Sequence, residues 1–243
     1  MIDSIRNLGL RNRVFLTILG IILLVGSLLY FKVQYDQSQA LHNSYLSIAQ
    51  NALDNRSQHL IIRIENLRNQ TRFLSQTPPV QAIARAIKNN GFDQLEGNSR
   101  SIWEQRLKDI FKAFLQANPF YFQLRYIGVA DNGKELIRVD YKNDQIITAT
   151  GEQLQSKGDE KYFIETLKMS EGEIYISDVT LNREFGVVQL PHVRTIRASV
   201  LVFTPDGELF GMVVANMDIG PVFDISNVAD STWYKRLCQQ SGG

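Results

Sequence analysis

Residues 14–31, VFLTILGIILLVGSLLYF, constrain the chain more than any other feature, because these 18 consecutive residues carry no charge and are almost all apolar. At 1.5 Å of rise per residue, a helix of about this length crosses the hydrocarbon core of a bilayer. Three arginines precede the segment and Lys32 follows it. Since basic residues near a span tend to stay in the cytoplasm, the sequence predicts a transmembrane helix at 14–32, with residues 1–13 inside and the rest outside.

A cleaved signal peptide is the alternative interpretation of this segment, because the apolar stretch is short. Its C-terminal end is bulky, with Tyr30, Phe31 and Lys32, and the nearest small-x-small site, at residues 38–40, comes late. These features favour an uncleaved anchor.

Composition excludes several classes of function. The chain has 243 residues, enough for one or two domains, and 26 Lys and Arg against 25 Asp and Glu give no clustered charge for a nucleic-acid partner. Cys238 is the one cysteine, and His42, His59 and His192 lack metal-ligand spacing. With no nucleophile elbow or phosphate loop, the sequence predicts a protein that is not an enzyme, with no catalytic residue, metal or cofactor.

A long amphipathic helix is predicted to continue out of the membrane. Residues 34–76 contain no proline or glycine, and apolar side chains recur every three or four positions until Pro78 and Pro79. Residues 33–78 are therefore predicted as a stalk helix about 60 Å long. Nothing in the chain is expected to cover its apolar positions nearest the membrane, which predicts a parallel homodimer through Leu41, Tyr45, Ile48 and Ala52.

The remainder changes from a helical period to a period of two residues. Helices are predicted at residues 80–89, 99–117 and 159–169, and strands at 123–130, 134–141, 144–148, 173–179, 194–204 and 208–217. The turns Asp131-Asn132-Gly133 and Pro205-Asp206-Gly207 join two pairs of strands as hairpins. The expected fold is α+β, an antiparallel sheet of about five strands with flanking helices.

Alternation sorts the strand side chains into two faces. The apolar face, expected to pack against the long helix, comprises Ile137, Val139, Ile196, Ala198, Val200, Val202, Val213, Ala215 and Met217. The opposite positions are Arg138, Asp140, Thr195, Arg197, Ser199, Asn216 and Asp218. If these polar positions are in phase across the sheet, they suit an anionic or zwitterionic metabolite, because arginine binds carboxylates bidentately. Solvated edge residues or structural ion pairs are the alternative.

Several short motifs carry a resemblance to a known family. They are Tyr162-Phe163, Leu181-Asn182-x-Glu184, Pro191 and Ile196-Arg197, within residues 121–140 and 154–219. These runs resemble the membrane-distal lobe of bacterial double-Cache sensor domains, which are PAS-like folds outside the membrane in histidine kinases, diguanylate cyclases and chemoreceptors. In order of elements the resemblance extends over residues 34–219.

The resemblance implies that residues 79–219 form a PAS-like Cache sensor lobe. Its pocket would lie on the sheet face away from the long helix, under residues 154–191. The resemblance adds Asn182 and supports Arg197 and Asp218 from the polar face, which also supplies Arg138, and Tyr162 suits a pocket wall because its body is apolar and it carries a hydroxyl. The predicted ligand contacts are therefore Arg138, Tyr162, Asn182, Arg197 and Asp218. Relatives usually carry an arginine two residues before the Tyr-Phe pair, where this chain has Glu160, so a ligand carboxylate loses a usual partner. Residues 220–243 are expected to begin a second lobe that is missing.

The expected function is a single-pass, ligand-sensing module of a bacterial signal-transduction receptor in the inner (cytoplasmic) membrane. The bulk of the chain would be periplasmic, and the long N-terminal helix would relay ligand binding to the membrane. The alternative is a membrane-anchored periplasmic binding or scaffold protein without signalling output.

Overall fold

The computed structural model describes residues 10–223, which belong to two compact units, Met1–Gln58 and His59–Gly243. Helix α2 (Leu10–Ser75) runs without interruption from the first unit into the second. Within it, the predicted apolar segment is long and apolar enough to cross a membrane, and its described side chains are exposed. The span and the stalk predicted from the sequence are thus successive parts of one helix.

Prolines and short turns set the limits of the helices in the second unit. Helix α3 (Pro78–Lys88) begins with two prolines, which the first turn of a helix tolerates because its N–H groups have no partner within the helix. Helix α4 (Arg100–Ala117) ends just before Pro119. Between these helices, the predicted loop contains a small hairpin, β1 (Phe92–Asp93) and β2 (Asn98–Ser99).

The sheet is antiparallel with the order β5-β4-β3-β11-β10-β6, and β7 also pairs with β10. The predicted α+β class is therefore confirmed. The sheet has seven strands rather than about five. The strand predicted at 173–179 is present as β6, whereas β7, with two residues, is too short to produce a periodic pattern. The strands are β3 (Tyr121–Gly128), β4 (Glu135–Lys142), β5 (Gln145–Thr148), β6 (Ile174–Ile176), β7 (Thr180–Leu181), β10 (Arg194–Phe203) and β11 (Leu209–Asp218).

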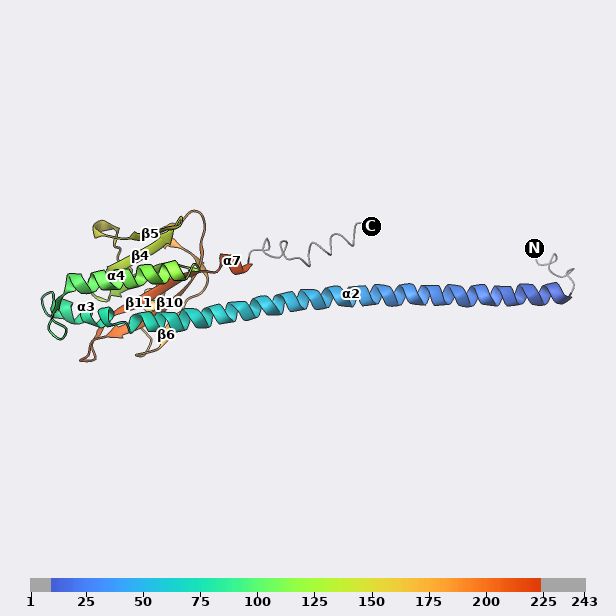
Figure 1. Cartoon of the computed structure of the whole chain (residues 1–243), viewed down its shortest axis with the longest axis horizontal. Helices are drawn as coiled ribbons and strands as arrows, with labels where there is room; N and C mark the ends of the chain where they lie inside the picture. The colour runs from blue at the N-terminus through green and yellow to red at the C-terminus, as the bar shows by residue number, and fades with distance from the viewer. Residues whose placement is uncertain (1–9, 224–243) are drawn as a thin grey trace. The chain divides into compact units, whose positions relative to one another are not determined.

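One face of the sheet carries the main hydrophobic core. The end of α2 packs there with α3 and α4, through residues such as Leu67, Ile83 and Phe111 (Figure 1). All nine strand residues predicted for this face belong to the core, so the prediction of the apolar face is confirmed. The Tyr126 hydroxyl donates a 3.0 Å hydrogen bond to the Val80 carbonyl and ties the sheet to α3.

The other face carries the short elements that form the candidate site. They are η1 (Gly151–Gln153), α6 (Lys161–Thr166) and a separate hairpin of β8 (Arg183–Glu184) and β9 (Val187–Val188). Helix α6 is shorter than the predicted 159–169. Phe163 packs with Leu201 and Met212 in a second, smaller hydrophobic cluster.

The turn between β3 and β4 fixes the loop that leads to α6. In α5 (Ala130–Gly133), Asp131, Asn132 and Gly133 all have positive φ, which is typical of the predicted Asp-Asn-Gly turn. Gly133 lies so close to Phe163 and to the Gly158 backbone that a Cβ would clash with both.

Helix α7 (Gly220–Phe223) is the last described element, and most of the predicted C-terminal segment, 220–243, lies outside the described residues.

Candidate functional site

The strand register aligns the polar side chains in one row across the sheet. Arg197 on β10 pairs with Asn216 on β11, which pairs with Gln123 on β3, which in turn pairs with Asp140 on β4. The polar positions of these strands are therefore in phase, a condition that the alternation within each strand left open. The Asn216 amide donates to the Gln123 side-chain oxygen at 2.6 Å, and the Gln123 amide donates to Asp140 at 2.7 Å.

A cavity of about 430 Å³ lies on this face, under the segment that leads from α6 to β9. It is lined by five basic and two acidic side chains together with apolar and hydroxyl-bearing residues. The charged ones are Arg125, Lys157, Lys161, Arg183, Arg197, Glu160 and Asp178. Lys161 and Asp178 pair with each other at 2.7 Å at the exposed rim, so the excess positive charge comes from the other charged lining residues.

Arg197 is the most distinctive residue of this cavity. It is 8% exposed and donates to the Thr180 hydroxyl at 2.7 Å and to the Asn182 side-chain oxygen at 3.1 Å. Its Nε is buried without a hydrogen-bond partner, and no carboxylate among the described residues lies within ion-pair distance of it. Burial, and then repulsion from Arg125, lowers the pKa of Arg197. A buried guanidinium in this state favours an anion nearby.

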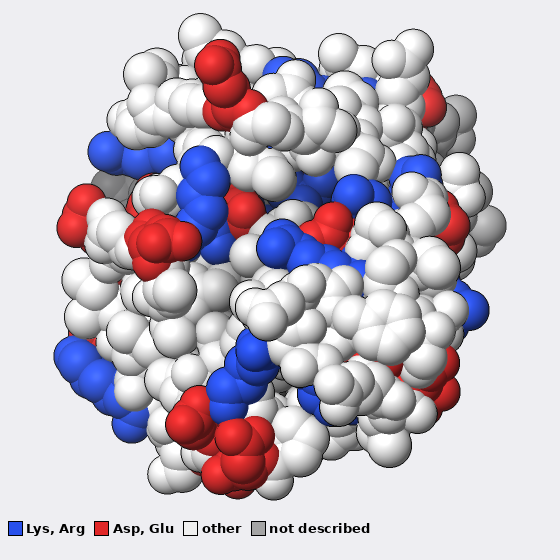
Figure 2. Space-filling view, turned by 90° about the vertical axis from the view of Figure 1, so that its left-hand side faces the viewer, with Lys and Arg blue, Asp and Glu red and all other residues white. Residues whose placement is uncertain are grey.

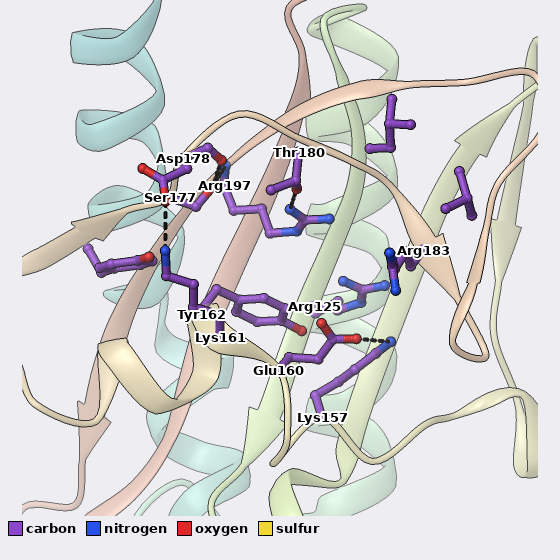
Figure 3. Close-up of a pocket in the computed structure, with 13 residues that line it drawn as sticks. Arg125, Lys157, Glu160, Lys161, Tyr162, Ser177, Asp178, Thr180, Arg183 and Arg197 are labelled. Atoms are coloured by element: carbon purple, nitrogen blue, oxygen red, sulfur yellow. Dashed lines mark hydrogen bonds and ion pairs between the residues drawn. The ribbon is translucent and has the colours of Figure 1, made fainter.

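Tyr162 and Arg125 complete the deep wall. Figure 3 shows the guanidinium groups of Arg197 and Arg125 extending into the same space from β10 and β3, with the Tyr162 ring from α6 beside them. The Arg197 guanidinium carbon lies 5.5 Å from the centre of that ring. The Tyr162 hydroxyl is buried without a partner, and burial raises the pKa of Tyr162 to about 12.

A buried ion-pair network adjoins the cavity. Arg125 pairs with Glu135 at 2.7 Å and with Glu184 at 2.8 Å, while Arg138 lies 3.1 Å from both Glu135 and Asp140. Burial would raise the pKa of Glu184, but Arg125 and hydrogen bonds from neighbouring amides lower it to about 2. Glu184 is therefore ionised throughout the physiological range.

Lys157 is the second cation without a close carboxylate. Its Nζ donates to the Gln155 side-chain oxygen at 2.9 Å, and the nearest carboxylate, on Glu160, is 3.8 Å away. Burial, and then repulsion from Arg125, lowers the pKa of Lys157. Lys157 and Arg197 thus both bring positive charge to the cavity wall.

The five residues predicted as ligand contacts occupy different places. Arg197 and Tyr162 line the cavity, and Asn182 is fully buried behind Arg197. Arg138 instead lines a neighbouring cavity of about 330 Å³, and its guanidinium is already paired with the carboxylates of Glu135 and Asp140. Asp218 lies at the end of β11, where it accepts a 2.7 Å hydrogen bond from the Gly220 amide. Ligand contact by Arg138 and Asp218 stays a prediction to which these positions add no support.

Sequence analysis did not single out several residues of the site. Gln123 and Arg125 alternate within an otherwise apolar strand, and this alternation was a usable signal. Glu135 gave no such signal, because a β-bulge between Tyr126 and Ile127 shifts the register and brings Glu135 onto the face of Arg138. Lys157 lies in a loop, where no period applies.

The charged side chains of one face of the molecule are mixed in sign. On the face shown in Figure 2, the described Lys and Arg side chains lie beside Asp and Glu rather than in a continuous basic surface. Within residues 10–223, no group of three or more His, Cys, Asp or Glu side chains is placed to hold a metal ion.

Two solved structures share this fold at low sequence identity. The first is a domain of a putative sensory box/GGDEF family protein from Vibrio parahaemolyticus, 16% identical, with a TM-score of 0.59 over 70% of this chain and 59% of that one. The second is the extracellular domain of the putative histidine kinase vpHK1S-Z8, 17% identical, with a TM-score of 0.54 over 71% of this chain and 60% of that one. This chain therefore spans about 60% of the length of the structures it matches.

Comparison with family models gives a match over most of the globular unit. No curated protein matches the chain. The family model described as bacterial histidine kinase, sensor domain, matches residues 89–242, well over half of the chain. These residues include the whole sheet and the cavity, and the resemblance to bacterial extracytoplasmic sensor domains is confirmed at this level. The chain therefore belongs to the family of bacterial histidine kinase sensor domains.

Proposed function

We propose that the chain is a membrane-anchored, extracytoplasmic sensing module whose cavity binds a small organic anion, or a zwitterion through its acidic group. The observation that carries the proposal is Arg197, which is buried at the cavity wall with a free Nε and no carboxylate partner among the described residues. A guanidinium fork binds a carboxylate through two parallel hydrogen bonds. An anionic group at this position would supply the missing counter-charge.

The other lining residues favour an anion over a neutral sugar. Lys157 adds a second buried cation, and Arg183, an exposed residue of the hairpin, adds a third positive side chain. Tyr162 offers a ring face and a hydroxyl without a partner. If the ligand is a zwitterion, Glu160 is the carboxylate best placed to receive its ammonium group. Asp178, the other lining carboxylate, is paired with Lys161 at 2.7 Å, and Asp218 does not line the cavity.

We further propose that helix α2 carries the signal toward the membrane. Leu67 and Leu74 of α2 are fully buried in the core that also contains the strand residues. Because this core is closely packed, a shift of the strands would displace the end of α2. The same helix is continuous back to the apolar residues 14–31. Residues 1–13 would be cytoplasmic, 14–32 would span the inner membrane, and 33–78 would form the stalk of a domain at 79–219, ahead of the segment 220–243.

The stalk also supports a proposal of a parallel homodimer. In the first unit, Leu41 and Tyr45 are 59% and 52% exposed, so this apolar stripe has no cover within its own unit. A second copy leaving the same membrane surface would present the same stripe alongside.

The experiment is a thermal-shift screen of carboxylates, amino acids and amines on the purified chain, followed by calorimetry. A charge-assisted pair contributes about 1.5–3 kcal/mol, so Arg197→Ala should weaken binding of the selected anion by roughly ten- to a hundredfold. Arg106→Ala is the matched control, because Arg106 is an exposed arginine of α4, which packs on the other face of the sheet.

Two results would contradict the proposal. If Arg197→Ala stays folded and binds the anion as tightly as wild type, the site is elsewhere. If Arg197→Ala unfolds while Arg106→Ala does not, Arg197 is a structural residue and its network with Thr180 and Asn182 serves the fold.

A further inference from the structure

The hairpin β8–β9 is attached to the domain in an unusual way. Its two strands pair with each other and not with the seven-stranded sheet. Two of its large apolar side chains face solvent, with Phe185 64% and Val187 70% exposed. Apolar burial therefore contributes little to holding the hairpin over the sheet.

Polar contacts of Glu184 hold the hairpin instead. This carboxylate is 23% exposed and receives hydrogen bonds on both oxygens from side chains of β3, of the loop before α6 and of the segment after β7. The donors are Gln123 at 2.9 Å, Arg125 at 2.8 Å and Asn182 at 3.3 Å to Oε1, and Gln155 at 2.6 Å to Oε2. The Phe185 amide adds one bond, donated to the Gln155 side-chain oxygen at 3.0 Å.

Arg125 connects this attachment to the cavity. Its Nε faces Glu135 at 2.7 Å, and its Nη2 donates to Glu184, while the residue itself lines the cavity. Glu135 is fully buried below the cavity and comes from the sheet, so it cannot leave. Glu184 belongs to the exposed hairpin, so it is the carboxylate that an incoming anion can replace on Arg125.

Arg125 and Arg197 are placed to meet one ligand together. β3 and β10 are separated by β11, so their backbones lie about 10 Å apart at the usual strand spacing. Their long side chains converge on the same space in Figure 3. A small molecule with two acidic groups therefore fits with one group on Arg197 and the other at Arg125.

We propose that Glu184 is a built-in carboxylate that occupies Arg125 in the empty site, and that an acidic group of the ligand replaces it and releases the hairpin β8–β9. This inference rests on the proposed anion-binding function and adds its consequence for the fold. Binding and release are linked, so whatever frees Arg125 from Glu184 also favours the ligand.

The test compares Glu184→Gln with Glu165→Gln in the full purified chain. Glu165→Gln makes the same change of charge on α6, where Glu165 pairs only with Lys168 among the described ion pairs and does not line the cavity. The probe is succinate, with succinamide as its uncharged counterpart at matched ionic strength. The measurements are calorimetry and hydrogen exchange of the backbone amides of residues 183–189.

The proposal predicts three results. Without ligand, residues 183–189 exchange about tenfold faster or more in Glu184→Gln than in the wild type and Glu165→Gln. Succinate, but not succinamide, speeds exchange of the same amides in the wild type. Glu184→Gln binds succinate about tenfold more tightly than the wild type, because its competitor for Arg125 is weakened.

Any one of three results would contradict the replacement of Glu184 by the ligand. The first is that residues 183–189 of Glu184→Gln are as protected from hydrogen exchange as those of the wild type, and the second is that succinate slows their exchange in the wild type. The third is that Glu184→Gln binds succinate no more tightly than the wild type, or not at all. Failure of the proposed function looks different. In that case Arg197→Ala leaves succinate binding unchanged, whatever Glu184→Gln does.

Discussion

At the scale of single residues, the Tyr162 hydroxyl is predicted to contribute to ligand binding but not to the stability of the fold. Its ring is buried in the cluster with Ile127 and Met212, but its hydroxyl is buried without a partner. Removing an unsatisfied buried polar group is neutral or stabilising by about 1 kcal/mol. Tyr162→Phe should therefore unfold in urea at an equal or higher concentration than the wild type, and bind the anion more weakly. Lower stability in urea would show that the hydroxyl supports the fold.

Glu184 predicts an acid-dependent loss of stability. Its pKa falls from an ordinary 4.5 to about 2 in the folded protein, so its contribution is fully present above pH 4.5 and disappears as the pH falls toward 2. The size is on the order of 3 kcal/mol. Burial raises the pKa of Asp140, so the contribution of Asp140 to stability changes with pH in the opposite direction. The contribution of Glu184 must therefore be obtained as the difference between the wild type and a variant that lacks this carboxylate.

Urea unfolding of wild type and Glu184→Gln between pH 7 and pH 3 makes this measurement. The free energy of unfolding of the wild type should exceed that of Glu184→Gln at pH 7, and the difference should shrink as the pH falls below 4.5. A constant difference across this range would contradict the assignment of a low pKa to Glu184.

The sequence predicted some residues of the site better than others, for a physical reason. Arg197 was found because residues 194–204 alternate regularly and because Ile196-Arg197 is one of the motifs that carry the family resemblance. Glu135 was not found, because the bulge opposite it breaks the alternation that such reasoning requires. Asp218 has the parity of Asn216, which pairs with Arg197, but it lies at the end of its strand, and parity fixes the face of a residue without fixing its position along the sheet.

At the scale of elements, the turn at Gly133 is predicted to set the loop that places Lys157. Gly133 and Gly151 both have positive φ, 68° and 53°, but only Gly133 is crowded. A left-handed conformation costs a residue with a Cβ about 1–2 kcal/mol, and overpacking adds about 1–3 kcal/mol. Gly133→Ala should therefore lower the free energy of unfolding in urea clearly more than Gly151→Ala does. Equal losses would show that Phe163 and its neighbours move to accommodate the added Cβ, and would contradict the prediction.

Long elements were predictable and short ones were not. The helices α3 and α4 and the strands of the two main hairpins follow from periods that extend over eight or more residues. The strand predicted at 173–179 is found over three residues as β6, but β7, β8 and β9 have two residues each, so no period exists there to detect. These short elements carry Thr180, Arg183 and Glu184, which explains why the cavity wall was less predictable than the sheet.

At the scale of the whole molecule, the proposed orientation in the membrane is open to a direct test. Basic residues precede the apolar segment, which favours a cytoplasmic N-terminus. A periplasm-active reporter fused after Gly220 should therefore be active, and a cytoplasm-active reporter at the same point should be inactive. The reverse pattern would contradict the orientation and the sensing function together.

The central claim is that Arg197 receives the anionic group of a ligand inside the cavity on the sheet. The most direct measurement is a crystal structure of the chain with the anion selected by the screen. The account predicts an acidic group within about 2.7–3.2 Å of the Arg197 guanidinium, with Tyr162 beside the ligand. An anion bound elsewhere, with Arg197 still bonded only to Thr180 and Asn182 as in the present structure, would contradict it.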